Sequence, residues 1–95
     1  MKSSWSPRAT KHLLSALDYW ADRASEDAAM LMLERVMKAI EMLEDFPSAG
    51  RLGRVSGTRE LIVRPMPYVI IYRVREKHVE IVSFLHTSRR WPDRS

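Results

Sequence analysis

The spacing of hydrophobic residues changes abruptly near Pro47, and this change limits what the chain can fold into. Before Pro47, apolar residues recur at three- and four-residue steps, which is the spacing of an amphipathic α-helix. After it come short runs that are rich in β-branched and aromatic residues, which is typical of β-strands. Helices followed by strands predict an α+β fold, in which the helices cover one face of a sheet.

Two helices are expected before Pro47. Residues 2–6 form a short expected strand, and Pro7 then suits the start of the first helix. Ser25 suits the N-cap of the second helix, because acidic residues follow it in the first turn, where the helix dipole favours anions. A joint this short predicts an antiparallel helical hairpin. The apolar stripes consist of Ala9, Leu13, Ala16, Leu17, Trp20 and Ala24 in the first helix and of Ala29, Met32, Leu33, Val36, Ile40 and Leu43 in the second.

Three strands are expected in the second half. Residues 48–57 contain all three glycines of the chain and are interpreted as an irregular connection. The strands are expected over residues 58–64, 68–74 and 79–86, separated by a break with two prolines and by a polar turn. The predicted order is β-α-α-β-β-β, with the helical hairpin packed on an antiparallel β-sheet.

Length and composition exclude several classes of protein. The 95 residues are enough for one domain, expected to span residues 1–95. The chain has no cysteine, and its three histidines are far apart in the sequence, which argues against a disulfide framework, a metal centre or another cofactor. It has neither a signal peptide nor a run of roughly 18 apolar residues, so we expect a cytoplasmic protein with no membrane contact.

Charge is distributed unevenly along the chain. Residues 1–46 contain six Lys/Arg and eight Asp/Glu, a balance of −2, whereas residues 47–95 contain ten Lys/Arg and four Asp/Glu, a balance of +6. A basic half of this kind, made almost wholly by arginine, indicates a polyanionic or acidic protein partner. The alternative is a surface that serves only solubility.

Four stretches in the second half together resemble a known family. They are "FPSAGR" (46–51), "GTRELIV" (57–63), "YVIIYRV" (68–74) and "VEIVSFLHTSRRWP" (79–92), preceded by the two helices. This ordered set is similar to the RelE/ParE superfamily of bacterial toxins from type II toxin–antitoxin modules, and closer to the ParE branch. The resemblance implies the fold predicted above and a plasmid-stabilisation type of toxin, held inactive by a cognate antitoxin that wraps it.

Candidate antitoxin contacts lie on the second helix and in the sheet. Met30 and Met37 fall beside the apolar stripe, and they are either flexible core filler or an adaptable docking surface. Together with Arg64 they are the expected antitoxin-binding residues. An amphipathic helix in a groove, or a strand added to an open sheet edge, would suit such a partner.

The superfamily has two main activities, and the sequence favours one of them. One branch cuts messenger RNA on the ribosome without a metal, and the residues available for such catalysis are His86, Arg59, Arg73 and Arg89, with Arg51 and Arg54 on the preceding loop. The other branch poisons DNA gyrase and is not known to break bonds itself. Val69 stands where ribonuclease members commonly place a phosphate-contacting arginine, and its face continues through Ile71. An apolar floor is unfavourable for a phosphorane, because a desolvated phosphate without donors is costly.

We therefore expect a gyrase inhibitor, with no catalytic residue of its own. The alternative is a metal-independent, ribosome-associated mRNA endoribonuclease, and a second alternative is a non-toxic nucleic-acid- or partner-binding domain. Target-binding residues are expected on the uncovered sheet face and in the tail, and the set comprises Arg59, Arg73, Arg89, Arg90 and Trp91. His86 is either part of a catalytic set or a strand end that hydrogen-bonds a backbone carbonyl.

Overall fold

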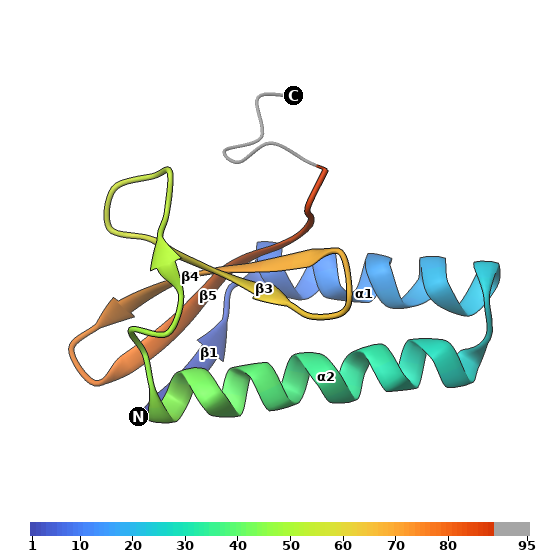
Figure 1. Ribbon diagram of the computed structural model, residues 1–95, viewed down its shortest axis with the longest axis horizontal. Helices are drawn as coiled ribbons and strands as arrows, with labels where there is room; N and C mark the ends of the chain where they lie inside the picture. The colour runs from blue at the N-terminus through green and yellow to red at the C-terminus, as the bar shows by residue number, and fades with distance from the viewer. Residues whose placement is uncertain (89–95) are drawn as a thin grey trace.

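Helices α1 (Pro7–Arg23) and α2 (Glu26–Asp45) form an antiparallel hairpin beside one sheet in the computed structural model, which describes residues 1–88 (Figure 1). The strands of this sheet are β1 (Lys2–Trp5), β2 (Arg51–Leu52), β3 (Arg59–Val63), β4 (Tyr68–Arg75) and β5 (His78–His86). The predicted order of helices and strands is confirmed. Among the described residues, no helix combines the length and the apolar character needed to span a bilayer.

The sheet is mixed, with the strand order β1-β5-β4-β3-β2. Strands β3, β4 and β5 form the predicted antiparallel meander. Two features differ from the prediction of a purely antiparallel sheet with an irregular 48–57 connection. Strand β1 pairs in parallel with β5, and Arg51 and Leu52 form β2 by pairing with β3. A two-residue strand shows no alternation, and the period of a strand does not encode its partner, so neither feature is visible in the sequence.

One face of the sheet is covered by the helices. Because residues directly opposite one another share a face, the pairs Ile70–Phe84 and Tyr72–Ile81 belong to this helix-covered face. All four side chains are in the buried core. The core also contains the predicted stripe residues Ala9, Leu13, Ala16, Met32, Val36, Ile40 and Leu43. Of the first stripe, Ala24 was predicted wrongly: it is exposed, because it caps the C-terminal end of α1 outside helical geometry.

The opposite face, called the open face below, contains the pairs Val69–Leu85, Ile71–Ser83 and Arg73–Glu80. A β-bulge separates the pairs Ile71–Ser83 and Tyr72–Ile81, so Val82 is the extra residue in β5. The alternation of β5 therefore changes at Val82. Residues beyond it point to the face opposite the one that strict alternation from Ile81 predicts.

The N-cap of α1 is joined to this bulge. Ser6 Oγ accepts a hydrogen bond from the Ala9 backbone N–H at 3.0 Å and donates to the Val82 carbonyl at 3.0 Å. The N-cap of α2, Ser25, as predicted accepts from the Ala28 N–H at 3.0 Å. The first cap thus fixes the entry of α1 against β5, whereas the second serves its own helix.

Ser6→Ala is expected to lower the free energy of unfolding by about 2 kcal/mol, because it removes a cap and leaves the Val82 carbonyl without its hydroxyl partner. Ser25→Ala removes a cap alone and should cost about 1 kcal/mol. Urea denaturation followed by circular dichroism measures both. Equal losses would show that the Ser6–Val82 hydrogen bond adds nothing.

Candidate interaction surfaces

The predicted target-binding arginines of the sheet lie on opposite faces. Arg59 is opposite Tyr72, which places it on the helix-covered face. Its Nη1 donates to the Gly50 carbonyl at 2.8 Å and to the Ser48 carbonyl at 3.4 Å. Arg73 lies on the open face, and its buried Nε has no hydrogen-bond partner among the described residues. The structure therefore does not bring Arg59 and Arg73 together, and Arg59 fastens the connection between α2 and β2.

His86 is on the helix-covered side of the sheet, because the bulge at Val82 inverts the end of β5. It lies opposite Tyr68, with ring centroids 5.4 Å apart and an interplanar angle of 79°. Its Nδ1 accepts from the Ser88 N–H at 3.1 Å and is 2.7 Å from Ser88 Oγ. The strand-end histidine thus contacts a backbone amide, not the backbone carbonyl that the sequence analysis offered as its non-catalytic role.

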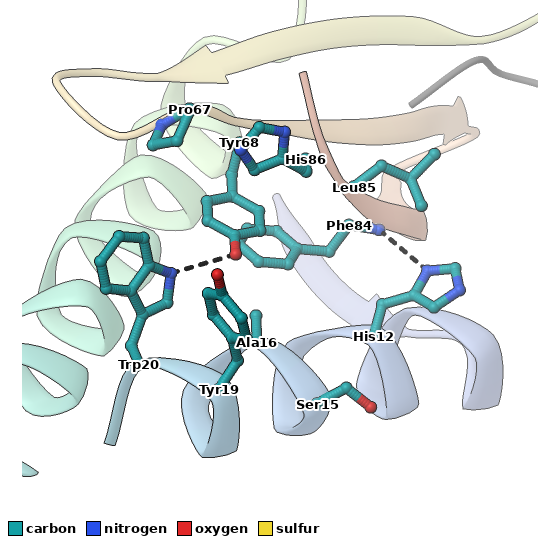
Figure 2. A pocket seen from close by; sticks show the side chains of 10 residues that line it. All are labelled: His12, Ser15, Ala16, Tyr19, Trp20, Pro67, Tyr68, Phe84, Leu85 and His86. Atoms are coloured by element: carbon teal, nitrogen blue, oxygen red, sulfur yellow. Dashed lines mark hydrogen bonds between the residues drawn. The ribbon is translucent and has the colours of Figure 1, made fainter. Parts of the chain in front are cut away.

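The ring of His86 lines a groove of about 480 Å³ beside α1. Figure 2 shows its aromatic lining, in which Trp20 Nε1 donates to the Tyr68 hydroxyl at 3.0 Å. His12 lies at the far end, where its Nδ1 is 3.5 Å from the Phe84 backbone nitrogen. Within residues 1–88, no arginine lines this groove. Arg89, Arg90 and Trp91 lie outside the described residues.

A small pocket, called the open-face pocket below, lies on the open face. Its volume is about 80 Å³. Ile62, Val69, Ile71 and Leu85 form its apolar lining, and Arg51, Arg54, Glu60 and Thr87 complete it. This lining contains Val69 and Ile71, the two residues that the sequence analysis placed on the face of Arg73. It lacks Arg73 itself.

Glu60 holds the charged side of this pocket together. Only 6% of the residue is exposed. Its Oε1 lies 3.2 Å from Arg51 Nη2, and its Oε2 accepts from the Arg54 backbone N–H at 3.1 Å. Arg51 belongs to β2, directly opposite Glu60. Glu60 was not predicted as a site residue, because its role depends on a cross-strand pair with a strand that the sequence does not reveal.

A second basic surface runs between α2 and the edge of β3, and it is called the α2/β3 groove below. Its volume is about 270 Å³. It is lined by Arg35, Lys38, Ala39, Met42, Leu61, Ile62, Val63 and Arg64. Strand β2 pairs only with the first two residues of β3, so the edge of residues 61–63 has no neighbouring strand among the described residues.

The predicted antitoxin contacts are divided between two sides of α2. Arg64 lines the α2/β3 groove, whereas Met30 and Met37 do not. With 3.6 residues per turn, Met30 and Met37 share one side of α2, roughly opposite Arg35. They are 59% and 38% exposed, so they are not core filler. The other basic residues of the groove, Arg35 and Lys38, are three positions apart on α2, which places them on one side of the helix. This spacing is visible in the sequence and could have indicated a basic helix face.

No cluster of three or more metal-ligating side chains occurs within residues 1–88. A buried hydroxyl instead organises the base of the α2–β2 connection. Tyr72 is fully buried, and its hydroxyl accepts from the Gly50 N–H at 2.8 Å and donates to the Pro47 carbonyl at 2.7 Å. Burial raises the pKa of the Tyr72 hydroxyl above 10.0, although the Gly50 hydrogen bond and the nearby Arg59 lower it in part.

A solved structure shares this architecture. A chain from the chromosomal ParDE toxin–antitoxin system of P. aeruginosa superposes with a TM-score of 0.82 at 22% identity, over 90% of this chain and 95% of that one. The sequence agrees with the fold, because the model of the ParE toxin family of the type II toxin–antitoxin system parDE matches residues 4–91. The chain belongs to this family, and it is the toxin component of such a system.

Two curated relatives are similar over nearly their whole length. Toxin RelE2 of Caulobacter vibrioides is 39% identical over 85 residues, which are 90% of this chain and 93% of that protein. The protein Y4kP of Sinorhizobium fredii is 34% identical over 88 residues, which are 93% of this chain and 90% of that protein. The predicted resemblance to the RelE/ParE superfamily is thereby confirmed.

Proposed function

We propose that this toxin arrests bacterial growth in the cytoplasm by binding and poisoning DNA gyrase, and that a cognate antitoxin neutralises it. Membership of the ParE family supports a target of this kind. The observation that carries the proposal is the separation of the candidate catalytic side chains: Arg73 is on the open face, whereas His86 and Arg59 are on the helix-covered face.

Metal-free RNA cleavage needs a base for the 2′-hydroxyl, a cation for the phosphorane and an acid for the leaving oxygen, all around one phosphate. Arg59 and His86 lie opposite Tyr72 and Tyr68. These tyrosines are four residues apart on β4, or roughly 13 Å at the usual rise of a strand. Arg73 is on the other face of the sheet, and the open-face pocket near it has an apolar floor. This arrangement favours binding over bond-breaking.

The α2/β3 groove is the proposed seat of the antitoxin. Its apolar floor and its rim of Arg35, Lys38 and Arg64 suit an acidic segment that also carries apolar side chains. The free edge of residues 61–63 can in addition accept a strand. Ile62 lines both this groove and the open-face pocket, so an antitoxin seated in the groove would lie next to the open face and hinder access to it.

Purified toxin is expected to block supercoiling of relaxed plasmid by DNA gyrase and to accumulate cleaved DNA complexes. The control is the same reaction with toxin that has been incubated with the antitoxin encoded beside it, which should restore supercoiling. Normal supercoiling at a large excess of toxin would refute gyrase poisoning. Codon-aligned cuts in transcripts from expressing cells, together with normal supercoiling, would favour the ribonuclease alternative.

A further inference from the structure

We infer that the open-face pocket binds an acidic segment of a protein partner, which inserts one small aliphatic side chain between Arg51 and Arg54 and pairs a neighbouring carboxylate with them. The inference rests on the proposed function in one respect, namely that the partner is the toxin's protein target. Arg51 and Arg54 at the rim belong to the candidate catalytic set, whereas the four apolar floor residues do not.

The floor of the pocket is suited to an aliphatic group. Ile71 is fully buried and Leu85 is 5% exposed, and Ile62 and Val69 lie beside them. Among the described residues, the floor contains no aromatic ring and no side-chain hydrogen-bond donor or acceptor. A cavity of about 150 Å³ is known to hold benzene, and this pocket of about 80 Å³ is smaller. A nucleobase is larger than benzene, whereas a valine- or leucine-sized group matches the space.

The rim is suited to carboxylates, because it carries two exposed guanidinium groups on an ordered loop. The side chain of Arg51 remains 64% exposed although it contacts Glu60, and Arg54 is exposed, with its backbone N–H held by the same carboxylate. The loop beyond is closed by the Gly53 N–H, which donates to the Thr58 carbonyl at 2.8 Å. Because this loop is already ordered, binding immobilises little additional chain, and this favours affinity.

The floor of the pocket, and not its rim, disfavours a nucleic acid. The Glu60 carboxylate in the lining would repel a phosphate and a partner carboxylate alike. Proteins that bind single strands without sequence preference commonly stack bases on aromatic side chains, and the described residues of this floor include none. An apolar anchor surrounded by charged pairs is instead the usual composition of a protein–protein contact.

Binding can be tested on the full-length, ¹⁵N-labelled protein by nuclear magnetic resonance. The probe is the blocked peptide Asp-Asp-Leu-Asp-Asp, which should shift the amide signals of Val69, Ile71 and Leu85. The matched peptide with alanine in place of leucine should bind about tenfold more weakly, because it loses the buried methyl groups. Equal binding of both peptides, or shifts confined to other strands, would overturn the inference.

Charge reversal separates the pocket from general electrostatics. Arg54→Glu should weaken both the binding of the leucine peptide and the inhibition of purified gyrase at least tenfold. The control Arg75→Glu makes the same charge change at the far end of β4 and should leave both nearly unchanged. The backbone N–H of Arg54, and not its side chain, donates the hydrogen bond to Glu60, so this substitution leaves that hydrogen bond in place. Similar behaviour of the two variants would refute the inference.

A volume change provides a test that alters no charge. Val69→Phe should fill the pocket and weaken the binding of the leucine peptide at least tenfold. The control Val74→Phe lies on the same strand, is 39% exposed and is outside the pocket, so it should leave peptide binding unchanged. Circular dichroism establishes that both variants fold. If the wild type binds the peptide but leaves gyrase unaffected, the gyrase proposal fails and the pocket stands. If it inhibits gyrase but tightly binds a thymidine pentanucleotide at the pocket in place of the peptide, the inference fails alone.

Discussion

Tyr72→Phe is expected to destabilise the protein by about 2–3 kcal/mol, although it removes a single oxygen atom. The Tyr72 hydroxyl joins the Gly50 N–H at 2.8 Å to the Pro47 carbonyl at 2.7 Å. Phenylalanine would leave both backbone groups without this partner, and each buried polar group left unpaired costs about 1–3 kcal/mol. Gly50 packs closely against this hydroxyl in the wild type, because a Cβ atom at position 50 would lie 2.6 Å from the Tyr72 hydroxyl oxygen.

The control is Tyr19→Phe, which also removes one phenolic hydroxyl but on a residue that is 49% exposed. Its effect should stay within about 0.5 kcal/mol, as for most surface substitutions. Urea unfolding at neutral pH, followed by circular dichroism, compares the two variants with the wild type. A loss for Tyr72→Phe no larger than that for Tyr19→Phe would show that the hydroxyl does not hold the α2–β2 connection.

The pH dependence gives the same comparison a second readout. Because burial raises the pKa of Tyr72 in the folded protein above 10.0, the unfolded chain loses its phenolic proton first as the pH rises. Stability from this group is therefore complete below pH 10 and falls as the pH rises from 10 through the folded pKa, by up to about 1.4 kcal/mol per pH unit. Tyr72→Phe lacks this group, so its stability disadvantage should shrink above pH 10.

Periodicity was sufficient to predict most of the fold. The stripes of both helices face the core because a helix repeats every 3.6 residues, and that signal lies in each helix alone. Strand β2 and the parallel pairing of β1 with β5 were not predictable in this way. Both depend on contacts between segments distant in the chain, which local spacing does not record.

The candidate site was harder to predict, and His86 shows why. With strict alternation from Ile81 on the helix-covered face, His86 would lie on the open face with Arg73. The extra residue Val82 inverts the strand after it, and His86 instead lies against Tyr68. A bulge of this kind has no reliable sequence signal, because Val82 itself is an ordinary strand residue. The prediction that Val69 and Ile71 share the face of Arg73 was correct, because β4 carries no inserted residue.

The double substitution Arg35→Glu/Lys38→Glu is expected to weaken antitoxin binding about 100-fold and to restore growth arrest in cells that produce both proteins. Both side chains are exposed on α2 and line the α2/β3 groove. Neither forms an ion pair with another described residue, so the fold should tolerate the change. Two like-charge contacts in place of two attractive ones would cost about 3 kcal/mol, which corresponds to roughly two orders of magnitude in Kd.

A matched control lies on the other helix. Arg8→Glu/Lys11→Glu changes the same two residue types at the same spacing, on exposed positions of α1 outside the groove. Isothermal titration calorimetry with the purified antitoxin should give a wild-type Kd for this variant, and unbound toxin of both variants should inhibit gyrase alike. Unchanged antitoxin affinity for Arg35→Glu/Lys38→Glu would remove the groove as the neutralisation site. Gyrase inhibition lost together with antitoxin affinity would mean that target and antitoxin compete for one surface around Ile62.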